Sequence, residues 1–182
     1  TRLDLPPSQV AIKVLGPTRS EKAKSFLKRE LAALLAIQAP QIPILYDWSL
    51  ENEAAFSVVE YFPSGSLADA WPLIGRFDEQ QCWRLISDLL SALSAAHRAS
   101  ILHLDVKPSN VLLDGDGGFV LTDFGVSHAS RMSQGLLNQG GISVGLGTHG
   151  YRAPEQDNCE LHSFDLRTDL WGVGATAWAL YT

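Results

Sequence analysis

Two carboxylates and one amide lie close together near the middle of the chain, at Asp105, Asn110 and Asp123. Transfer of a phosphoryl group between oxygens needs a carboxylate that takes or orients the proton of the nucleophile. It also needs ligands for Mg²⁺, and a second carboxylate with an amide oxygen supplies them, because hard divalent cations prefer oxygen. Lys107, two residues after the first acid, can neutralise charge on the transferred group. These residue types and spacings predict phosphoryl-transfer chemistry.

Three motifs contain these residues or follow them along the chain. His-x-Asp-x-Lys-Pro-x-Asn spans residues 103–110, Asp-Phe-Gly spans 123–125 and Ala-Pro-Glu spans 153–155. A lone Asp-Phe-Gly would be weak evidence of function. The three motifs together are poorly explained as a chance match. In these motifs the chain resembles the protein kinase family, and Gln156 after Ala-Pro-Glu is most similar to bacterial members.

The resemblance implies an α+β, two-lobed fold of the protein kinase type. We expect a partial N-lobe with the hinge in residues 1–62, and a partial, mainly helical C-lobe with the catalytic and activation loops in residues 63–182. The C-lobe is expected to end inside a helix that Asp169 begins. Apolar spacing and breaking residues predict strands at 10–15, 44–48 and 55–62 and helices at 20–38 and 78–100.

Lys13 and Glu30 are candidates for an ion pair between a strand and a helix. Lys13 ends a Val-Ala-Ile-Lys run, and the resemblance implies that it contacts the α- and β-phosphates of ATP while Glu30 holds it there. Taken alone, Lys13 is explained as an exposed strand lysine and Glu30 as a solvated acid. Glu21 competes with Glu30, but it lies in the first helical turn, where the helix dipole explains an acid. The downstream motifs favour the Lys13–Glu30 pair.

The resemblance also implies which residues surround the adenine of ATP. Backbone groups at Glu60 and Phe62 would bind its edge, and the small Val59 would leave access behind it open. Ala11 and Leu112 would lie on opposite faces of the base.

Ser66 falls where the family contacts the ribose, although a capping box with Asp69 explains this serine on structural grounds alone. The implied nucleotide-binding set is Lys13, Ala11, Val59, Glu60, Phe62, Ser66, Lys107, Leu112 and Asp123.

Each group in the catalytic segment has a role that the resemblance implies. Asp105 would accept or orient the proton of the substrate hydroxyl, and Lys107 would contact the γ-phosphate. Asn110 and Asp123 would be the Mg²⁺ ligands. Thr148 would bridge Asp105 and Lys107, and the lysine and threonine are both typical of kinases directed at serine and threonine. The implied catalytic set is Asp105, Lys107, Lys13 and Glu30.

Three further positions concern the support of the catalytic loop, which is the motif at residues 103–110. His103 is expected to pack under Phe124. Asp169 resembles the buried aspartate that braces the loop backbone in the family, and it is also explained as a helix N-cap. Leu104 stands where the family's usual arginine binds a phosphate on the activation loop. Because leucine cannot do so, we expect less dependence on phosphorylation of that loop.

The expected helix at 78–100 begins with Asp78 as N-cap and Gln81 placed to cap back. His97 near its end is explained by the helix dipole, and we assign it no chemistry. An apolar stripe predicted to lie in the core consists of Trp83, Ile86, Leu89, Leu90, Leu93 and Ala96.

Composition excludes several classes of protein. The chain has 182 residues, 46% of them hydrophobic, and a net charge of −6, which suits one domain with a real core and argues against a nucleic-acid partner. No run approaches the roughly 18 apolar residues of a membrane span, and the first residues lack the core of a signal peptide. Cys82 and Cys159 are too few for a disulfide framework or metal site, so we expect thiols in a reducing compartment, the cytoplasm.

The first 12 residues contain no glycine, so the glycine-rich loop that the family places before Lys13 is not expected within this chain. The family's last helices would follow Thr182, and without them apolar surface of Trp171, Val173 and Trp178 should be exposed. At about 25 cal/mol per Å², a few hundred Å² amount to several kcal/mol, against a domain stability of roughly 5–15 kcal/mol. We therefore expect these 182 residues alone to be poorly soluble or inactive, and the full-length parent to be active.

Three functions remain to be compared at this point. The leading one is an ATP- and Mg²⁺-dependent kinase that phosphorylates serine or threonine of proteins. The second is an inactive kinase-like interaction module, which a missing Lys13, Asp105, Asn110 or Asp123 would favour, but all four are present. The third is a small-molecule phosphotransferase, against which the peptide-docking segment 147–155 argues.

Overall fold

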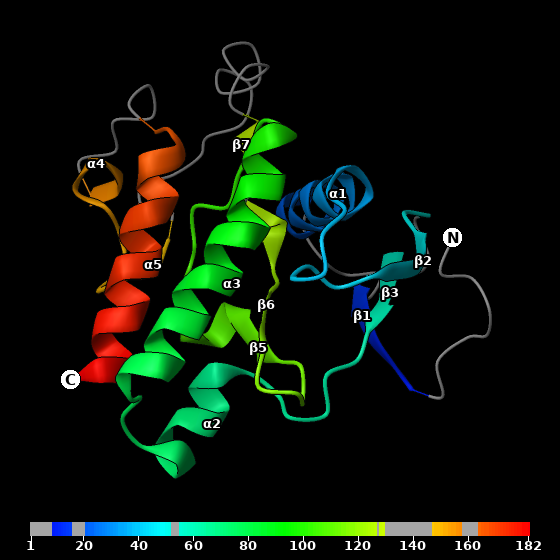
Figure 1. Ribbon diagram of the computed structural model, residues 1–182. Coiled ribbons are helices and arrows are strands. Elements are labelled where there is room, and N and C mark those ends of the chain that lie inside the picture. The colour runs from blue at the N-terminus through cyan, green and yellow to red at the C-terminus, as the bar shows by residue number, and fades with distance from the viewer. Residues whose placement is uncertain (1–8, 16–20, 52–54, 127, 130–146, 158–163) are drawn as a thin grey trace.

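A three-stranded sheet with one helix beside it and a group of further helices occupy opposite sides of the molecule (Figure 1). The computed structural model describes residues 9–15, 21–51, 55–126, 128–129, 147–157 and 164–182. The predicted α+β class is confirmed, since strands and helices alternate at the start and helices dominate afterwards.

The sheet consists of β1 (Val10–Leu15), β2 (Leu45–Ser49) and β3 (Ala55–Glu60) in the order β1-β3-β2, with both pairs antiparallel. Register pairs Ala11 with Val59 and Lys13 with Ser57. An irregularity between Leu45 and Asp47 shifts the pairing of β2. The third predicted strand ends two residues earlier than expected, and the chain leaves the sheet after Glu60.

Helix α1 (Glu21–Ala36) packs on the sheet through Leu27 and Leu31, which form a small apolar cluster with Ala55. Leu35 is exposed, because it lies about 40° beyond Leu31 around a helix of 3.6 residues per turn and has no neighbour there to cover it. Glu30 precedes Leu31 and is itself buried, so the helix brings one acid to its inner side.

Helix α3 (Glu79–Arg98) forms the centre of the main core, and the predicted capping box of Asp78 with Gln81 is confirmed. The buried face is made by Cys82, Leu85, Leu89, Ala92, Leu93, Ala95 and Ala96. The prediction that Trp83 and Leu90 lie in the core is wrong, since Trp83 is 63% exposed and Leu90 is also exposed. Each follows a buried residue by one position, which turns its side chain about 100° toward solvent.

Helix α5 (Leu166–Tyr181) lies beside α3 (Figure 1) and begins earlier than predicted. Its N-cap is Asp165, in a capping box with Thr168. The alternative explanation of Asp169 as an N-cap is therefore wrong, and Asp169 is a buried residue of the first turn. The shorter helix α2 (Leu67–Ile74) starts at a capping box of Ser66 with Asp69, as predicted.

Short strands and single turns make up the rest of the described structure, with β5 and β6 between the sheet and the long helices (Figure 1). β4 (Ile101–Leu102) pairs with β7 (His128–Ala129), and β5 (Val111–Leu113) pairs with β6 (Phe119–Leu121). Single turns are η1 (Pro108–Asn110), η2 (Phe124–Val126) and α4 (Pro154–Asp157). In the hairpin between β5 and β6, Asp114 accepts backbone N–H bonds from Asp116 and Gly118, so it closes the turn from within.

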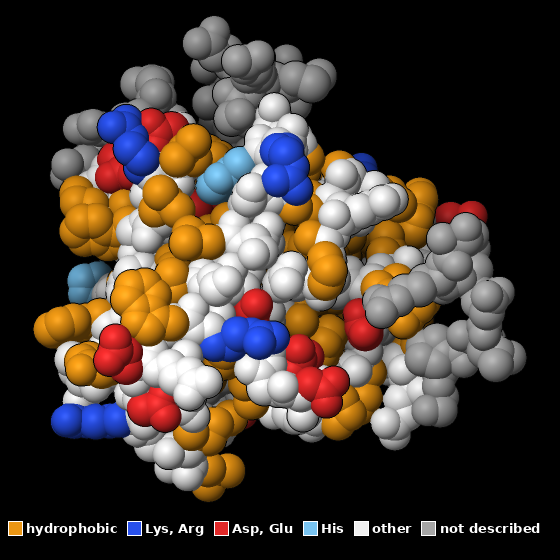
Figure 2. Space-filling model, viewed as in Figure 1, with side chains coloured by type: hydrophobic (Ala, Val, Ile, Leu, Met, Phe, Trp, Pro, Cys, Tyr) orange, Lys and Arg blue, Asp and Glu red, His pale blue; other side chains and the backbone are white. Residues whose placement is uncertain are grey.

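Exposed apolar side chains gather along one side of α5. Trp171 and Trp178 are exposed as expected, and Figure 2 has hydrophobic atoms over the left side of the view, where Figure 1 has α5. The same expectation is wrong for Val173, which is buried in the core shared with α3. Among the described residues, no helix has the length and apolar character needed to cross a membrane.

The buried Asp88 on α3 forms two hydrogen bonds whose contribution to stability can be measured. Asp88 accepts hydrogen bonds from the Phe119 backbone N–H at 3.1 Å and from Arg84 Nε at 2.9 Å. Asp88→Ala leaves the Phe119 N–H without an acceptor, and we expect a loss of about 1–3 kcal/mol in the free energy of unfolding measured with urea. Asp88→Asn keeps an acceptor oxygen and should lose less. An Asp88→Ala protein as stable as wild type would contradict this assignment.

Candidate active site

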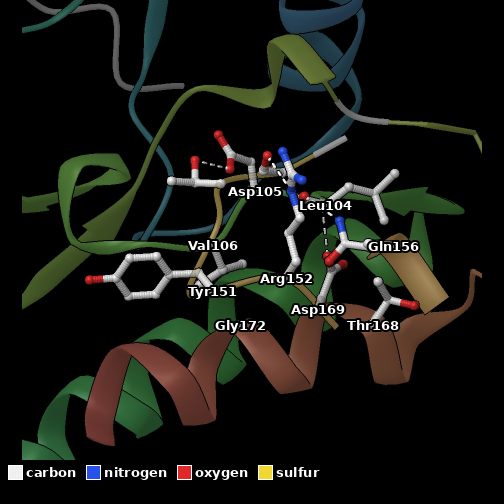
Figure 3. Close-up of a pocket in the computed structure, with 11 residues that line it drawn as sticks. Leu104, Asp105, Val106, Tyr151, Arg152, Gln156, Thr168, Asp169 and Gly172 are labelled. Carbon is white, nitrogen blue, oxygen red and sulfur yellow. Dashed lines mark hydrogen bonds between the residues drawn. The ribbon is translucent and has the colours of Figure 1, made fainter. Parts of the chain in front are cut away.

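Asp105 lies at the centre of a hydrogen-bonded network beside the N-terminal half of α5 (Figure 3). Lys107 Nζ lies 2.8 Å from Asp105 Oδ2, and the Thr148 hydroxyl donates to Asp105 Oδ1 at 2.8 Å. The same hydroxyl accepts from Lys107 Nζ at 2.6 Å, so the predicted bridge between Asp105 and Lys107 is present. Asp105 Oδ1 still has a lone pair for a further donor, whereas Oδ2 also accepts from Asn110 Nδ2. The network therefore orients Asp105 without closing it off from a substrate hydroxyl.

Asn110 is fixed against the same carboxylate. Its Nδ2 donates to the Asp105 backbone carbonyl at 2.8 Å and to Asp105 Oδ2 at 3.2 Å. Because both contacts use the amide nitrogen, Asn110 Oδ1 remains available to coordinate a cation. The backbone carbonyl of Asn110 accepts from Thr122 N–H at 2.9 Å, which brings Asp123 close to Asn110 across the β5–β6 pair.

Asp123 has a left-handed backbone conformation, with φ of 63°, which is uncommon outside glycine. Its side chain is 49% exposed, whereas the next residue, Phe124, is fully buried. The Phe124 ring meets the His103 ring edge-on, with centroids 4.6 Å apart, as predicted. His103 Nε2–H donates to the Thr122 carbonyl at 3.0 Å, while its Nδ1 accepts from Asp105 N–H at 3.2 Å. The buried rings thus hold Asp123 with its carboxylate toward solvent.

Lys13 extends from the sheet to α1 and to Asp123. Its Nζ lies 2.7 Å from Glu30 Oε2 and 3.7 Å from Asp123 Oδ1. Burial lowers the pKa of Lys13, but Glu30 and Asp123 together raise it more, so the ammonium holds its proton. Burial raises the pKa of Glu30, and the Lys13 charge offsets only part of that effect. The predicted strand–helix ion pair is therefore formed, and Lys13 points at the site that contains Asp123.

Four of the residues predicted to bind the nucleotide come together in two pairs. Ala11 and Val59 are directly opposite each other in β1 and β3. Ser66 forms a β-bridge with Leu112, so these two residues lie side by side although they are far apart in the sequence. The Ser66 hydroxyl is engaged with Asp69 in the capping box, which accounts for this serine without a ligand.

Backbone hydrogen bonds limit what the expected hinge offers. The Glu60 N–H donates to the Ile44 carbonyl at 2.9 Å, and the Phe62 carbonyl accepts from Gly65 N–H at 3.0 Å. The Glu60 carbonyl and the Phe62 N–H, one acceptor and one donor, take part in neither of these bonds. This pair still suits an adenine edge, which carries both kinds of group.

The donor set fits a hard cation bound together with phosphates. Asn110 Oδ1 and the Asp123 carboxylate offer oxygen atoms to such a cation, and no group of three His, Cys, Asp or Glu side chains in the described parts of the chain could hold a metal. Mg²⁺ usually takes one or two protein oxygens and completes its shell with phosphate and water. The ammonium group of Lys13 offers a positive charge of the kind that phosphates would need.

The catalytic loop is supported from below by α5, as predicted for Asp169. Its Oδ1 accepts from Leu104 N–H at 2.7 Å, and its Oδ2 accepts from His103 N–H at 2.9 Å. Gly172, one turn later, lets the loop approach, since a Cβ there would lie 2.9 Å from Val106 Cβ. Leu104 is 3% exposed with φ of 65°, and its apolar side chain has no group that could bind a phosphate.

Two residues of this support were missed in the sequence. His97 Nε2–H donates to Asp169 Oδ2 at 2.8 Å, although the helix dipole had explained the histidine. Gln156 Nε2 donates to the Leu104 carbonyl at 2.8 Å. Their partners lie far along the chain, and only the three-dimensional fold brings them together. The stretch 130–146, which contains most of the expected activation loop, lies outside the described residues.

Comparisons with known proteins agree with the geometry. The family model described as protein kinase domain matches residues 6–182. A probable serine/threonine-protein kinase, pknA2, of Bifidobacterium longum is 35% identical over 179 residues, which are 95% of this chain and 23% of that protein. CBL-interacting serine/threonine-protein kinase 3 of Arabidopsis thaliana is 32% identical, with 94% of this chain and 38% of the relative covered. Serine/threonine-protein kinase cds1 of Schizosaccharomyces pombe is 28% identical, with 93% and 37% covered. The chain thus spans less than two fifths of the length of each of these relatives.

The Lys13–Glu30 pair predicts a measurable change in lysine reactivity. In Glu30→Gln the main group that raises the pKa of Lys13 is lost while burial still lowers it, so the pKa of Lys13 should fall. More of the amine is then neutral at mildly alkaline pH. An amine-reactive ester should label Lys13 several-fold faster, as quantified by peptide mass spectrometry.

Two controls make this labelling test specific. The exposed Lys28 is an internal reference whose labelling should not change. Glu51→Gln makes the same chemical change at an exposed acid and should leave Lys13 unaffected. Equal labelling of Lys13 in wild type and Glu30→Gln would contradict the ion pair in solution.

Proposed function

Since the chain belongs to the protein kinase family, we propose that it carries the catalytic centre of an ATP-dependent protein serine/threonine kinase. The observation that carries the proposal is that the contacts around Asp105 and the ion pair of Lys13 with Glu30 are formed in the same structure. The acceptors would be serine or threonine hydroxyls of proteins, the phosphoryl donor ATP, and the required ion Mg²⁺. A cytoplasmic location suits this reaction, and Cys82 is a free, buried thiol.

Asp105 is the group that would receive the proton of the acceptor hydroxyl. The hydroxyl oxygen forms a bond to the γ-phosphorus while the bond from that phosphorus to the bridging oxygen of ADP breaks. The proton of the hydroxyl passes to the Asp105 carboxylate, and ADP leaves with the electron pair of the broken bond. Lys107, held by Asp105 and Thr148, offsets negative charge on the phosphoryl group in transit.

Lys13, Asn110 and Asp123 would position the nucleotide for this in-line transfer. Lys13, fixed by Glu30, would lie against the α- and β-phosphates, and the oxygens of Asn110 and Asp123 would hold Mg²⁺. When bound, the ion neutralises charge on the phosphates. Ala11, Val59, Leu112 and the hinge groups would enclose the base between sheet and helices.

Specificity for serine and threonine is supported by two kinds of observation. The Lys107–Thr148 contact lies beside Asp105, where the resemblance implies a serine/threonine-directed site. The three relatives compared above are all named serine/threonine-protein kinases.

One observation favours a second candidate, a kinase-like interaction module without activity. Leu104 is buried and apolar beside the catalytic aspartate, so this position has no charged group through which the site could be switched on. Against it, Lys13, Asp105, Asn110 and Asp123 are all present, and each contacts another residue of the proposed site.

Phosphoryl transfer by the full-length protein decides between these candidates. We expect Mg·ATP-dependent transfer of ³²P to a generic basic protein, with label on serine or threonine. Asp105→Asn removes the proton acceptor but keeps the size of the side chain, and should reduce kcat by at least about 100-fold. Asp114→Asn is the matched control, because asparagine closes the same exposed turn and should leave kcat unchanged.

The outcomes of this assay separate the proposals. Full transfer by Asp105→Asn would contradict the assigned proton acceptor. A folded wild-type protein that transfers nothing would support the interaction module instead. Label on tyrosine would overturn the serine/threonine specificity while leaving the kinase activity intact.

A further inference from the structure

The backbone of Leu104 is held at both its N–H and its carbonyl group. Its N–H donates to Asp169 on α5, and its carbonyl accepts from Gln156 Nε2 on α4, at 2.7 and 2.8 Å (Figure 3). The residue has a left-handed backbone conformation, which a non-glycine residue adopts only when its surroundings enforce it. Asp105 follows directly, so the orientation of the Leu104–Asp105 peptide, whose carbonyl Gln156 binds, fixes where the Asp105 side chain starts.

Gln156 is suited to this place by its amide group. It is 4% exposed, and besides donating to Leu104 it accepts the Ala153 N–H at its Oε1, at 2.9 Å. A carboxylate of the same shape has no donor for the Leu104 carbonyl, and an apolar side chain has neither group. The position therefore requires one donor and one acceptor at the same time.

The segment that follows the activation loop lies directly on this hydrogen bond. Gly147 has φ of 86°, and a Cβ there would lie 2.9 Å from both the Leu104 carbonyl oxygen and Gln156 Nε2. Arg152 Nε donates to the Gly147 carbonyl at 2.7 Å and closes the segment on itself. Thr148, the next residue, makes the contacts to Asp105 and Lys107. The Gln156–Leu104 bond thus joins the acceptor side of the site to the catalytic loop.

We propose that Gln156 is a positioning residue, whose amide holds the Leu104 peptide and the 147–152 segment together so that Thr148 and Asp105 meet in the reactive arrangement. The inference rests on the proposed kinase activity and adds a residue to it that touches neither nucleotide nor acceptor. Loss of this link should lower kcat and leave the KM for ATP nearly unchanged, since Lys13, Asn110 and Asp123 keep their contacts.

An isosteric variant gives the proposal a pH-dependent signature. In Gln156→Glu, an ionised carboxylate faces the Leu104 carbonyl and cannot donate, whereas the protonated form can donate there and still accept from Ala153 N–H. Burial and the nearby Asp105 and Asp169 oppose ionisation of the new acid, and Arg152 favours it; Glu155 and Asp157 flank it on α4. Lowering the pH should therefore restore the missing hydrogen bond.

The experiment compares kcat of the full-length wild type, Gln156→Glu and Gln156→Ala between about pH 6 and pH 8.5 with one acceptor protein. We expect Gln156→Glu to lose at least about tenfold in kcat at the alkaline end, and to recover most of it relative to wild type at the acidic end. Gln156→Ala should lose activity at every pH, with ATP KM within about threefold of wild type. Gln81→Glu, in the capping box of α3, is the matched control and should follow the wild-type profile.

Each outcome supports or overturns the proposal. If the wild type transfers phosphate and both variants have its kcat, the role of Gln156 is overturned and the proposed function stands. The same holds if Gln156→Glu loses the same fraction of kcat at all pH values. A wild type without transfer would overturn the proposed function and this inference with it. If Gln156→Ala fails to fold, as judged by thermal unfolding, the pH profile of Gln156→Glu decides by itself.

Discussion

The buried carboxylate of Asp169 is the interaction on which the rest of the site depends. It accepts the N–H groups of His103 and Leu104 and the Nε2–H of His97, and it is almost completely removed from water. Removing an ionised carboxylate from water is unfavourable by several kcal/mol unless donors replace the lost hydration. Three donors do so here, and two of them are consecutive backbone groups. The helix that carries Asp169 thereby dictates the path of the catalytic loop, including the left-handed conformation of Leu104.

From this anchor the contacts extend in sequence to both substrates of the proposed reaction. The fixed loop presents Asp105 to Lys107, Thr148 and Asn110, while the His103 ring supports Phe124 and with it the exposed Asp123 carboxylate. Lys13 then connects Asp123 to Glu30 and so to the sheet and α1. A displacement of Asp169 would therefore change the position of Lys13, and the reverse, because each contact in this series shares a residue or an adjacent residue with the next. This arrangement explains how a reaction centre can be precise although its residues come from a strand, a helix and three loops.

Motif reasoning predicted the residues that touch the substrates better than those that hold them in place. Lys13, Glu30, Asp105 and Thr148 could be paired in advance because the family resemblance specifies partners, and the capping box at Asp78 follows from local spacing alone. His97 and Gln156 had adequate local explanations, a helix dipole and a residue after a motif, so nothing in the sequence pointed to partners 72 and 52 residues away. The prediction that Trp83 is buried was wrong for a related reason, because the apolar character of a residue does not show which side of its helix packs against another element. The roles of such residues depend on tertiary contacts, and a short stretch of one sequence does not show which distant residues will be in contact.

Catalysis by an Asp169→Asn variant of the full-length protein tests most directly whether this carboxylate organises the site. Asparagine keeps the shape but offers one acceptor oxygen and an amide that cannot accept, so one of the two loop N–H groups loses its partner. We predict that kcat falls at least about tenfold while the KM for ATP stays within about threefold. Asp165→Asn in the same helix is the control, because asparagine is an equally good N-cap, and it should keep wild-type kcat. A folded Asp169→Asn protein with the kcat of wild type would show that the catalytic loop holds its conformation without this carboxylate.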